Sequence, residues 1–290
     1  MRPLKSITGE TAVLEGHKNM KTRILAAVVL VPALLVIVLA APVIVAAVIF
    51  AVMMAIGSYE LLYQTGLVRH PRMVIYSSLA AFAVAMWSYA GAVSAYLLLG
   101  LMAYCVLLFS EMMMDHVRVR FEKLAVCFVS GFVVPYLLSA LVRILSSVNG
   151  RYVILVPFVV AFLSDAGAYF VGLKFGRHKL APVVSPNKTI EGALGGVLGA
   201  IVGMVIYALI LDLVFPYLEI SYGAAILYGL AGSAAGVFGD LCFSIIKRQT
   251  GIKDYGNLIP GHGGILDRFD SMMMVAPLVE ALLVILPVVR

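Results

Sequence analysis

The chain has 290 residues, of which 63% are hydrophobic and only 12% are charged, and its mean hydropathy is +1.06. A soluble globular domain carries roughly 25% charged residues, so this composition excludes a soluble enzyme, a disordered protein and a free nucleic-acid-binding protein. The formal net charge of +6 is typical either of polyanion binding or of the inner loops of a membrane protein.

Nine apolar stretches follow a polar N-terminal arm at residues 1–22, and each approaches the ~20 residues that a helix needs to cross a bilayer. They lie at residues 24–41, 43–63, 73–90, 92–110, 124–143, 152–173, 192–214, 222–246 and 271–289. The first resembles a signal peptide, but a second apolar stretch follows at once and favours a retained span. The sequence predicts an all-α, polytopic helical bundle at residues 23–290, with its catalytic half at about residues 152–290.

Basic residues are distributed unevenly between the two sides of this predicted bundle. If the N-terminal arm lies in the cytoplasm, 18 of the 21 Lys and Arg residues fall on the inner side, and only Arg143, Arg151 and Arg290 fall outside. The positive-inside rule therefore predicts a protein of the cytoplasmic membrane with its N-terminus inside and its C-terminus outside. Glu60 and Glu280 lie near span ends, where we expect interfacial placement.

Two inner segments, residues 172–192 and 244–270, are rich in Gly and Pro and dense in charged residues. The spans that lead into them contain Asp165 and Asp240, and an ionisable residue at membrane depth is a candidate functional residue. On a helix, residues at i, i+4 and i+7 share one face. This spacing places together Asp165, Tyr169 and Gly172, and likewise Asp240, Ser244 and Lys247.

Four aspartates are candidate metal ligands. Asp267 and Asp270 are spaced i, i+3 where the last helix is expected to begin, so both can face one cation together with Asp165 and Asp240. Carboxylate oxygens suit Mg²⁺, which is commonly bound through one or two protein carboxylates and substrate phosphates. Neither segment has the Cys or His spacing of a zinc site.

Basic residues and glycines in the same segments predict phosphate binding at the cytoplasmic face. Ser185-Pro186 has the pattern of a helix N-cap, which would place Lys188 and Thr189 in the first helical turn, where anions bind well. Glycines around His262, at positions 261, 263 and 264, would let backbone N–H groups approach a phosphate. Positive charge is added by Lys247, Arg248, Lys253 and Arg268.

Each of these residues alone also has a structural interpretation. Lys247 and Arg248 could be ordinary positive-inside residues, Asp267 and Arg268 could form a local ion pair, and His262 could be a structural residue of a glycine-rich loop. The functional prediction therefore depends on their joint arrangement.

The second segment resembles the signature of the phosphatidate cytidylyltransferase family, which are integral-membrane CDP-diacylglycerol synthases. The matching residues are Ser244-x-x-Lys247-Arg248, Lys253-Asp254 and Pro260-Gly-His262-Gly263-Gly264-x-x-Asp267-Arg268-x-Asp270. The first segment is similar to the family's other motif through Asp165-x-Gly-Ala-Tyr169, Gly172, Gly176 and Ser185-Pro-x-Lys188-Thr189-x-Glu191-Gly192. The chain departs from the family pattern at Phe243, where an acidic residue is usual, and at Ala166 and Asn187.

This resemblance implies the reaction CTP + phosphatidate → CDP-diacylglycerol + pyrophosphate, dependent on Mg²⁺ and allowing a second cation. Asp240 and Asp267 would bind the catalytic cation, with Asp165 and Asp270 around them, and His262 would position pyrophosphate. Phosphates would be held by Lys188, Lys247, Arg248 and Arg268, and substrate binding would also involve Ser185, Thr189, Ser244, Lys253, Gly263 and Gly264. The expected partners are CTP, phosphatidate and membrane lipids, without nucleic acid; a homodimer is compatible with the sequence.

Three other classes of protein share some of these features. Buried acids and interrupted spans also suit a transporter or channel, but here the charged motifs cluster at the cytoplasmic ends and no inverted repeat is evident. Another membrane nucleotidyl- or phosphotransferase, such as a polyprenol kinase or a CDP-archaeol-type synthase, is the nearer alternative. A non-catalytic scaffold is disfavoured by the intact motif.

Overall fold

The computed structural model describes residues 28–29, 31–91, 93–258 and 263–289. Residues 28–29 and 31–39 are helical. The helix that begins at Val43 ends in a π-helical turn at Glu60–Gln64, and a second π-helical turn lies at Val129–Val133. In chain order the elements are α2 (Val43–Tyr59), η1 (Glu60–Gln64), α3 (Pro71–Ala90), α4 (Ser94–Met114), α5 (Phe121–Phe128), η2 (Val129–Val133), α6 (Val134–Leu138), α7 (Ala140–Ser146), α8 (Gly150–Val153), α9 (Leu155–Phe175), β1 (Lys179–Ala181), β2 (Ser185–Thr189), α10 (Ile190–Val214), α11 (Tyr222–Gln249), α12 (Leu266–Phe269) and α13 (Met272–Ile285).

Seven helical segments in the described part of the chain are long and apolar enough to cross a membrane. They correspond to the second through eighth of the nine predicted spans. The ninth is a 14-residue apolar helix, α13. In the predicted first span, residues 28–29 and 31–39 are helical, while residues 24–27 and 30 lie outside the described residues. An integral membrane protein is therefore confirmed at the level of helix length and composition, whereas the count of nine and the orientation stay predictions.

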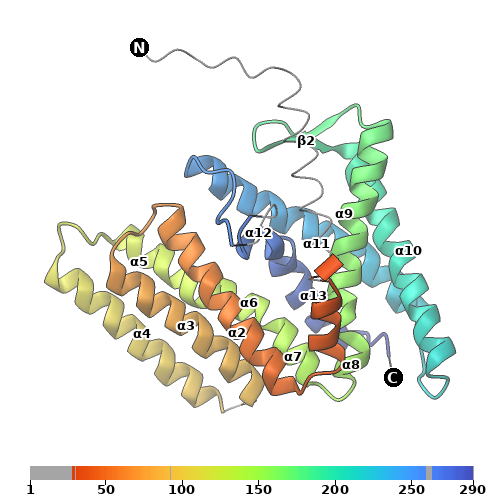
Figure 1. The fold of residues 1–290 in the computed structure, drawn as a ribbon, viewed down its shortest axis with the longest axis horizontal. Coiled ribbons are helices and arrows are strands. Elements are labelled where there is room, and N and C mark those ends of the chain that lie inside the picture. The colour runs from red at the N-terminus through yellow and green to blue at the C-terminus, as the bar shows by residue number, and fades with distance from the viewer. Residues whose placement is uncertain (1–27, 30, 92, 259–262, 290) are drawn as a thin grey trace.

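The helices form two groups, with α12 and α13 between them (Figure 1). One group contains α2 to α6, and the other contains α9, α10 and α11. The larger cluster of buried apolar side chains draws on α2, α3, α6, α7, α9, α10, α11 and α13, while a smaller one lies among α3, α4 and α5. The last third of the chain is thus packed against the first third as well as against its own neighbours.

The contacts between loops agree with alternating membrane crossings. Glu60, near the predicted inner end of the second span, contacts Ile265 and Leu266 of the predicted inner segment 244–270. In the predicted outer set, Ile220 pairs with Val289 in an isolated β-bridge, and the hydroxyl groups of Tyr152 and Tyr217 lie 2.9 Å apart. Each observed contact therefore joins loops that were predicted to share a side.

The expected helix start at Ser185 is wrong. Residues 185–189 form strand β2, which pairs antiparallel with β1 and projects beyond the ends of α9 and α10 (Figure 1). Helix α10 begins only at Ile190, because the Thr189 side chain is its N-cap and accepts a hydrogen bond from the Gly192 N–H at 3.1 Å. The structure is therefore mainly α-helical with one two-stranded β-hairpin.

Glu60 and Glu280, which were expected at the membrane interface, both have partners within the protein, and their depth relative to a membrane stays a prediction. Glu60 is buried, with 3% of its surface exposed. Glu280 forms a two-pronged ion pair with Arg143, with distances of 2.5 Å to Nε and 2.7 Å to Nη2, and so joins α13 to α7. Both carboxylates have partners far away in the sequence, which position relative to a span end does not reveal.

Candidate active site

The two charged segments meet at one end of the bundle, where the β-hairpin lies beside the C-terminal part of α11. Lys188 on β2 forms an ion pair with Asp240 on α11. The Arg248 Nε, just over two turns further along α11, donates a hydrogen bond to the Val184 carbonyl at 3.1 Å. Lys188 and Asp240 were both predicted site residues, and the fold brings them into contact although 52 positions separate them.

A groove of about 570 Å³ lies between α9, α10, α11 and the hairpin. Its charged end contains Asp165, Asp240 and Lys188. Its remaining lining is largely apolar and includes Leu173 and Val237. The predicted helical stripe of Asp165, Tyr169 and Gly172 is confirmed, since all three line this groove. A charged end beside an apolar wall can accommodate an amphiphilic molecule.

Close packing of α9 against α10 holds the hairpin over the groove. A Cβ atom on Gly195 would lie only 2.5 Å from the Val171 Cγ2, so a side chain there would force the helices apart. Glu191, in the first turn of α10, accepts N–H hydrogen bonds from Arg177 and His178 and contacts the His178 Nδ1 at 2.6 Å. These contacts fasten the segment that leads from α9 into the hairpin.

The predicted stripe on α11 is also present. The Ser244 hydroxyl donates a hydrogen bond to the Asp240 Oδ1 at 3.1 Å. One turn further, the Lys247 Nζ lies 3.0 Å from the Asp267 Oδ1 and 4.0 Å from the Asp270 Oδ2. This face of α11 therefore connects the groove to the segment around α12.

Asp267 has its acceptor oxygens occupied by the protein itself. Besides the Lys247 ammonium on Oδ1, its Oδ2 accepts N–H hydrogen bonds from Tyr255 at 2.7 Å and Gly264 at 3.0 Å. Only 7% of the residue is exposed. With three donors around it, this buried carboxylate holds the loop in place. The Gly264 N–H, which was expected to face a phosphate, points to Asp267 instead.

Asp165 and Asp270 differ from Asp267 because little compensates their charge. Asp165 forms no hydrogen bond or ion pair with the residues described here. Burial raises the pKa of Asp270 to about 7, and the nearby carboxylates of Asp240 and Asp165 also raise it, while Lys247 lowers it. Negative charge thus accumulates between α9, α11 and α12.

This donor set fits Mg²⁺ in its chemistry, since hard carboxylate oxygens with surplus negative charge attract a divalent cation. Within the described ranges, no three Asp, Glu, His or Cys side chains already stand close enough together to hold a metal ion. The predicted ligands Asp165, Asp240, Asp267 and Asp270 all lie in this region. Both oxygens of Asp267 contact donors of the protein, and so do both oxygens of Asp240.

Phe243 and Tyr255 support this arrangement, and the sequence did not single them out for it. Their rings pack edge to face with centroids 5.7 Å apart, and the Tyr255 hydroxyl donates to the Phe243 carbonyl at 2.9 Å. Tyr255 also contacts Asp267 through its backbone N–H. Phe243, which replaces the acidic residue usual in the family, therefore supplies packing beneath the loop.

The remaining predicted site residues make fewer contacts with the rest of the site. Lys253 and Arg268 are exposed and form no ion pair within the described part of the chain. Ser185 pairs with Ala181 within the hairpin. Gly263 has a φ of +85°, so it needs the conformational freedom of glycine. His262 lies outside the described residues.

Comparisons with known proteins agree with the motifs. A phosphatidate cytidylyltransferase of Staphylococcus haemolyticus (strain JCSC1435) is 37% identical over 217 residues, which are 72% of this chain and 78% of the relative. One of Staphylococcus aureus (strain COL) is 45% identical over 139 residues, covering 47% of this chain and half of the relative. One of Staphylococcus epidermidis (strain ATCC 35984) is 37% identical over 191 residues, covering 64% and 68%.

The family sequence model described as "Cytidylyltransferase family" matches residues 21–286. The match covers both charged segments and all seven long apolar helices. This chain therefore belongs to the cytidylyltransferase family and is a nucleotidyltransferase enzyme.

Proposed function

We propose that the protein transfers a cytidylyl group from CTP to phosphatidate, giving CDP-diacylglycerol and pyrophosphate, at the cytoplasmic face of the membrane. The observation that carries this proposal is the groove in which Lys188, Asp165 and Asp240 lie beside an apolar wall. A lipid phosphate has the same division into a charged headgroup and an apolar remainder. The names of the relatives support the same substrate pair.

The reaction requires no strong general base. A phosphate-monoester oxygen of phosphatidate attacks the α-phosphorus of CTP, and the new P–O bond replaces the bond from that phosphorus to the oxygen bridging the α- and β-phosphates. Pyrophosphate leaves with the bonding electron pair, so no oxidation or reduction occurs. The main barrier is electrostatic, because two polyanions must meet, and preorganised positive charge lowers it.

Lys188 and Lys247 are the ammonium groups best placed to supply that charge. Each is held by an aspartate, Asp240 and Asp267 respectively, so each is oriented before substrate arrives. Arg248, whose Nε is held by the hairpin, adds a third cation at the same end. Together these residues would bind and orient the phosphates of both substrates.

Mg²⁺ would be held by Asp165, Asp240 and Asp270. When bound, it supplies positive charge against the triphosphate and the leaving pyrophosphate. Asp267 would act differently, since it fixes the loop and orients Lys247 rather than donating a free oxygen.

The test uses the purified full-length protein in detergent with radiolabelled CTP, phosphatidate and Mg²⁺, and the lipid products are separated chromatographically. We expect labelled CDP-diacylglycerol and stoichiometric pyrophosphate. Parallel reactions replace phosphatidate by a polyprenyl phosphate or by a lipid alcohol. Product with either of these and none with phosphatidate would assign the protein to a different membrane transferase class.

A further inference from the structure

Glu60 is a buried carboxylate in the N-terminal half of the chain, outside both charged segments. It is the first residue of η1, the π-helical turn that follows α2. Such turns are rare and occur frequently at functional sites. Among the described residues it has no ion-pair partner, so its burial must be offset by hydrogen bonds.

Those hydrogen bonds come from the segment that begins α12. The Glu60 Oε1 accepts from the Ile265 N–H at 3.1 Å, and its Oε2 accepts from the Leu266 N–H at 2.8 Å. These two N–H groups belong to the start of a helix, where no helical acceptor is available to them. One carboxylate therefore satisfies two backbone donors that lie 205 and 206 positions away.

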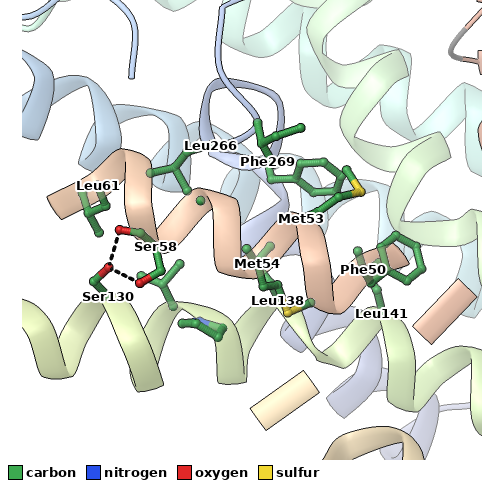
Figure 2. A pocket seen from close by; sticks show the side chains of 14 residues that line it. Phe50, Met53, Met54, Ser58, Leu61, Ser130, Leu138, Leu141, Leu266 and Phe269 are labelled. Atoms are coloured by element: carbon green, nitrogen blue, oxygen red, sulfur yellow. Dashed lines mark hydrogen bonds between the residues drawn. The ribbon is translucent and has the colours of Figure 1, made fainter. Parts of the chain in front are cut away.

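Side-chain packing holds the same two elements together. Leu266 and Phe269 of α12 line a narrow pocket with Met53, Ser58 and other residues of α2 (Figure 2). The Ser58 and Ser130 hydroxyl groups, 2.9 Å apart, close one side of this pocket and tie α2 to η2. The α2 surface on which α12 rests is thus held against η2.

The loop also closes directly around the Glu60 carboxylate. A Cβ atom on Gly264 would lie 2.5 Å from both Glu60 oxygens, and one on Gly256 would meet Oε1 still more closely. Both distances are below the 3.0 Å that real Cβ atoms respect. A side chain at either position would therefore have to displace the Glu60 carboxylate from its present place.

Glu60 and Asp267 hold adjacent donors of one loop. Asp267 takes the N–H groups of Tyr255 and Gly264, and Glu60 takes those of the next two residues along the chain. Asp267 in turn orients the Lys247 ammonium. A shift of the loop away from Glu60 would therefore displace Asp267 and, through it, Lys247.

We propose that Glu60 is a positioning residue for nucleotidyl transfer: from the N-terminal half it holds the loop that carries Gly264 and Asp267 in its reactive arrangement. This inference rests on the proposed function for its kinetic consequence. The local geometry of the loop, however, can be tested independently of any activity.

The test compares Glu60→Gln with wild type and with a matched control, Glu111→Gln. Glu111 is also a buried glutamate, 4% exposed. Its partners are the Tyr76 hydroxyl at 3.3 Å, the Arg72 guanidinium at 3.7 Å and the His70 imidazole at 3.8 Å, and none of them belongs to the loop. Glutamine keeps the size of the side chain and one acceptor oxygen, so the variant should fold. Glu60→Ala removes both acceptor oxygens and therefore tests whether a larger loss of hydrogen bonds gives a larger effect.

Two measurements are made on each purified, full-length variant. The first is kcat and KM for CTP, and the second is amide hydrogen exchange in peptides covering residues 250–270. We expect Glu60→Gln to lower kcat about 10-fold, as for one lost charge-assisted hydrogen bond, with faster exchange at residues 264–267. Glu60→Ala should exceed both effects, and Glu111→Gln should show neither.

A Glu60→Gln variant with wild-type kcat and wild-type exchange would overturn the inference. Equal losses in Glu60→Gln and Glu111→Gln would also overturn it, because any buried carboxylate would then have the same effect. If the wild type makes no CDP-lipid, the proposed function fails, and the exchange comparison alone decides whether Glu60 positions the loop.

Discussion

Replacing Asp267 by Asn tests whether this carboxylate anchors the loop. The amide can keep one oxygen toward the two backbone N–H donors of Tyr255 and Gly264, but it then presents an NH₂ group to the Lys247 ammonium, now 3.0 Å from an oxygen. Lys247 retains only Asp270, whose nearest oxygen is 4.0 Å away. The variant therefore breaks an ion pair whose side chains are 12% and 3% exposed.

The magnitude follows from this burial. Breaking one partner of a buried ion pair costs ~3–5 kcal/mol, and the remaining Asp270 contact places the expected loss at the lower end, about 3 kcal/mol. The assay is the apparent unfolding temperature in detergent, with CDP-lipid formation measured on the same preparations. Asp115→Asn is the control, because Asp115 is a partly exposed aspartate whose partners are local, namely the Arg118 N–H at 3.1 Å and the Arg118 guanidinium at 3.8 Å.

Asp267→Asn should lose turnover and unfold several degrees below wild type, whereas Asp115→Asn should do neither. Asp270→Asn separates the two roles, since its local bond from the Ser271 N–H survives the change. That variant should lose Mg²⁺-dependent turnover with no loss of stability. If Asp267→Asn has the unfolding temperature of wild type while Asp270→Asn unfolds at a lower temperature, the assignment of loop anchor and metal ligand is reversed.

Four further predictions concern the site and its surroundings. Chelation of divalent cations by EDTA should abolish CDP-lipid formation, and added Mg²⁺ should restore it. Lys188→Met should lower kcat/KM for CTP roughly 100-fold, as expected for one lost group that stabilises developing charge, measured from initial rates. Gly264→Ala should destabilise the protein because its Cβ would meet the carboxylate beneath the loop, whereas Gly223→Ala, where no atom lies within 4 Å, should have the unfolding temperature of wild type. Arg143→Gln should lower the unfolding temperature through loss of the Glu280 pair, yet keep the specific activity of the folded fraction.

The helices were predictable because their signal is local. An apolar run of about 20 residues needs no knowledge of its neighbours, so seven predicted spans match long helices within a few residues. The contact of Ser244 with Asp240 was predictable for the same reason, since both lie on one helix at i, i+4. Motif resemblance added the family, which the family match confirms.

The sequence was least informative for residues whose structure depends on contacts with distant parts of the chain. Ser185-Pro186 has the pattern of a helix start, but pairing of β2 with β1 extends the backbone as far as Thr189, which then caps the helix. Glu60 could not be recognised as a loop anchor from its position near a span end, because its donors lie more than 200 residues away. The donors to Asp267 could not be foreseen for the same reason, since Lys247, Tyr255 and Gly264 all lie outside its helix α12.

The carboxylates at this end of the molecule therefore divide by what their oxygens contact. Glu60 and Asp267 are bound by backbone N–H groups, and such a carboxylate cannot change partner during turnover unless the loop itself unfolds. Asp240 is bound instead by side chains, Lys188 and Ser244, which can rotate away. A reaction that brings in a triphosphate and releases pyrophosphate changes the local charge in every cycle. Carboxylates with exchangeable partners suit that change, and carboxylates with fixed partners keep the loop in place while it happens.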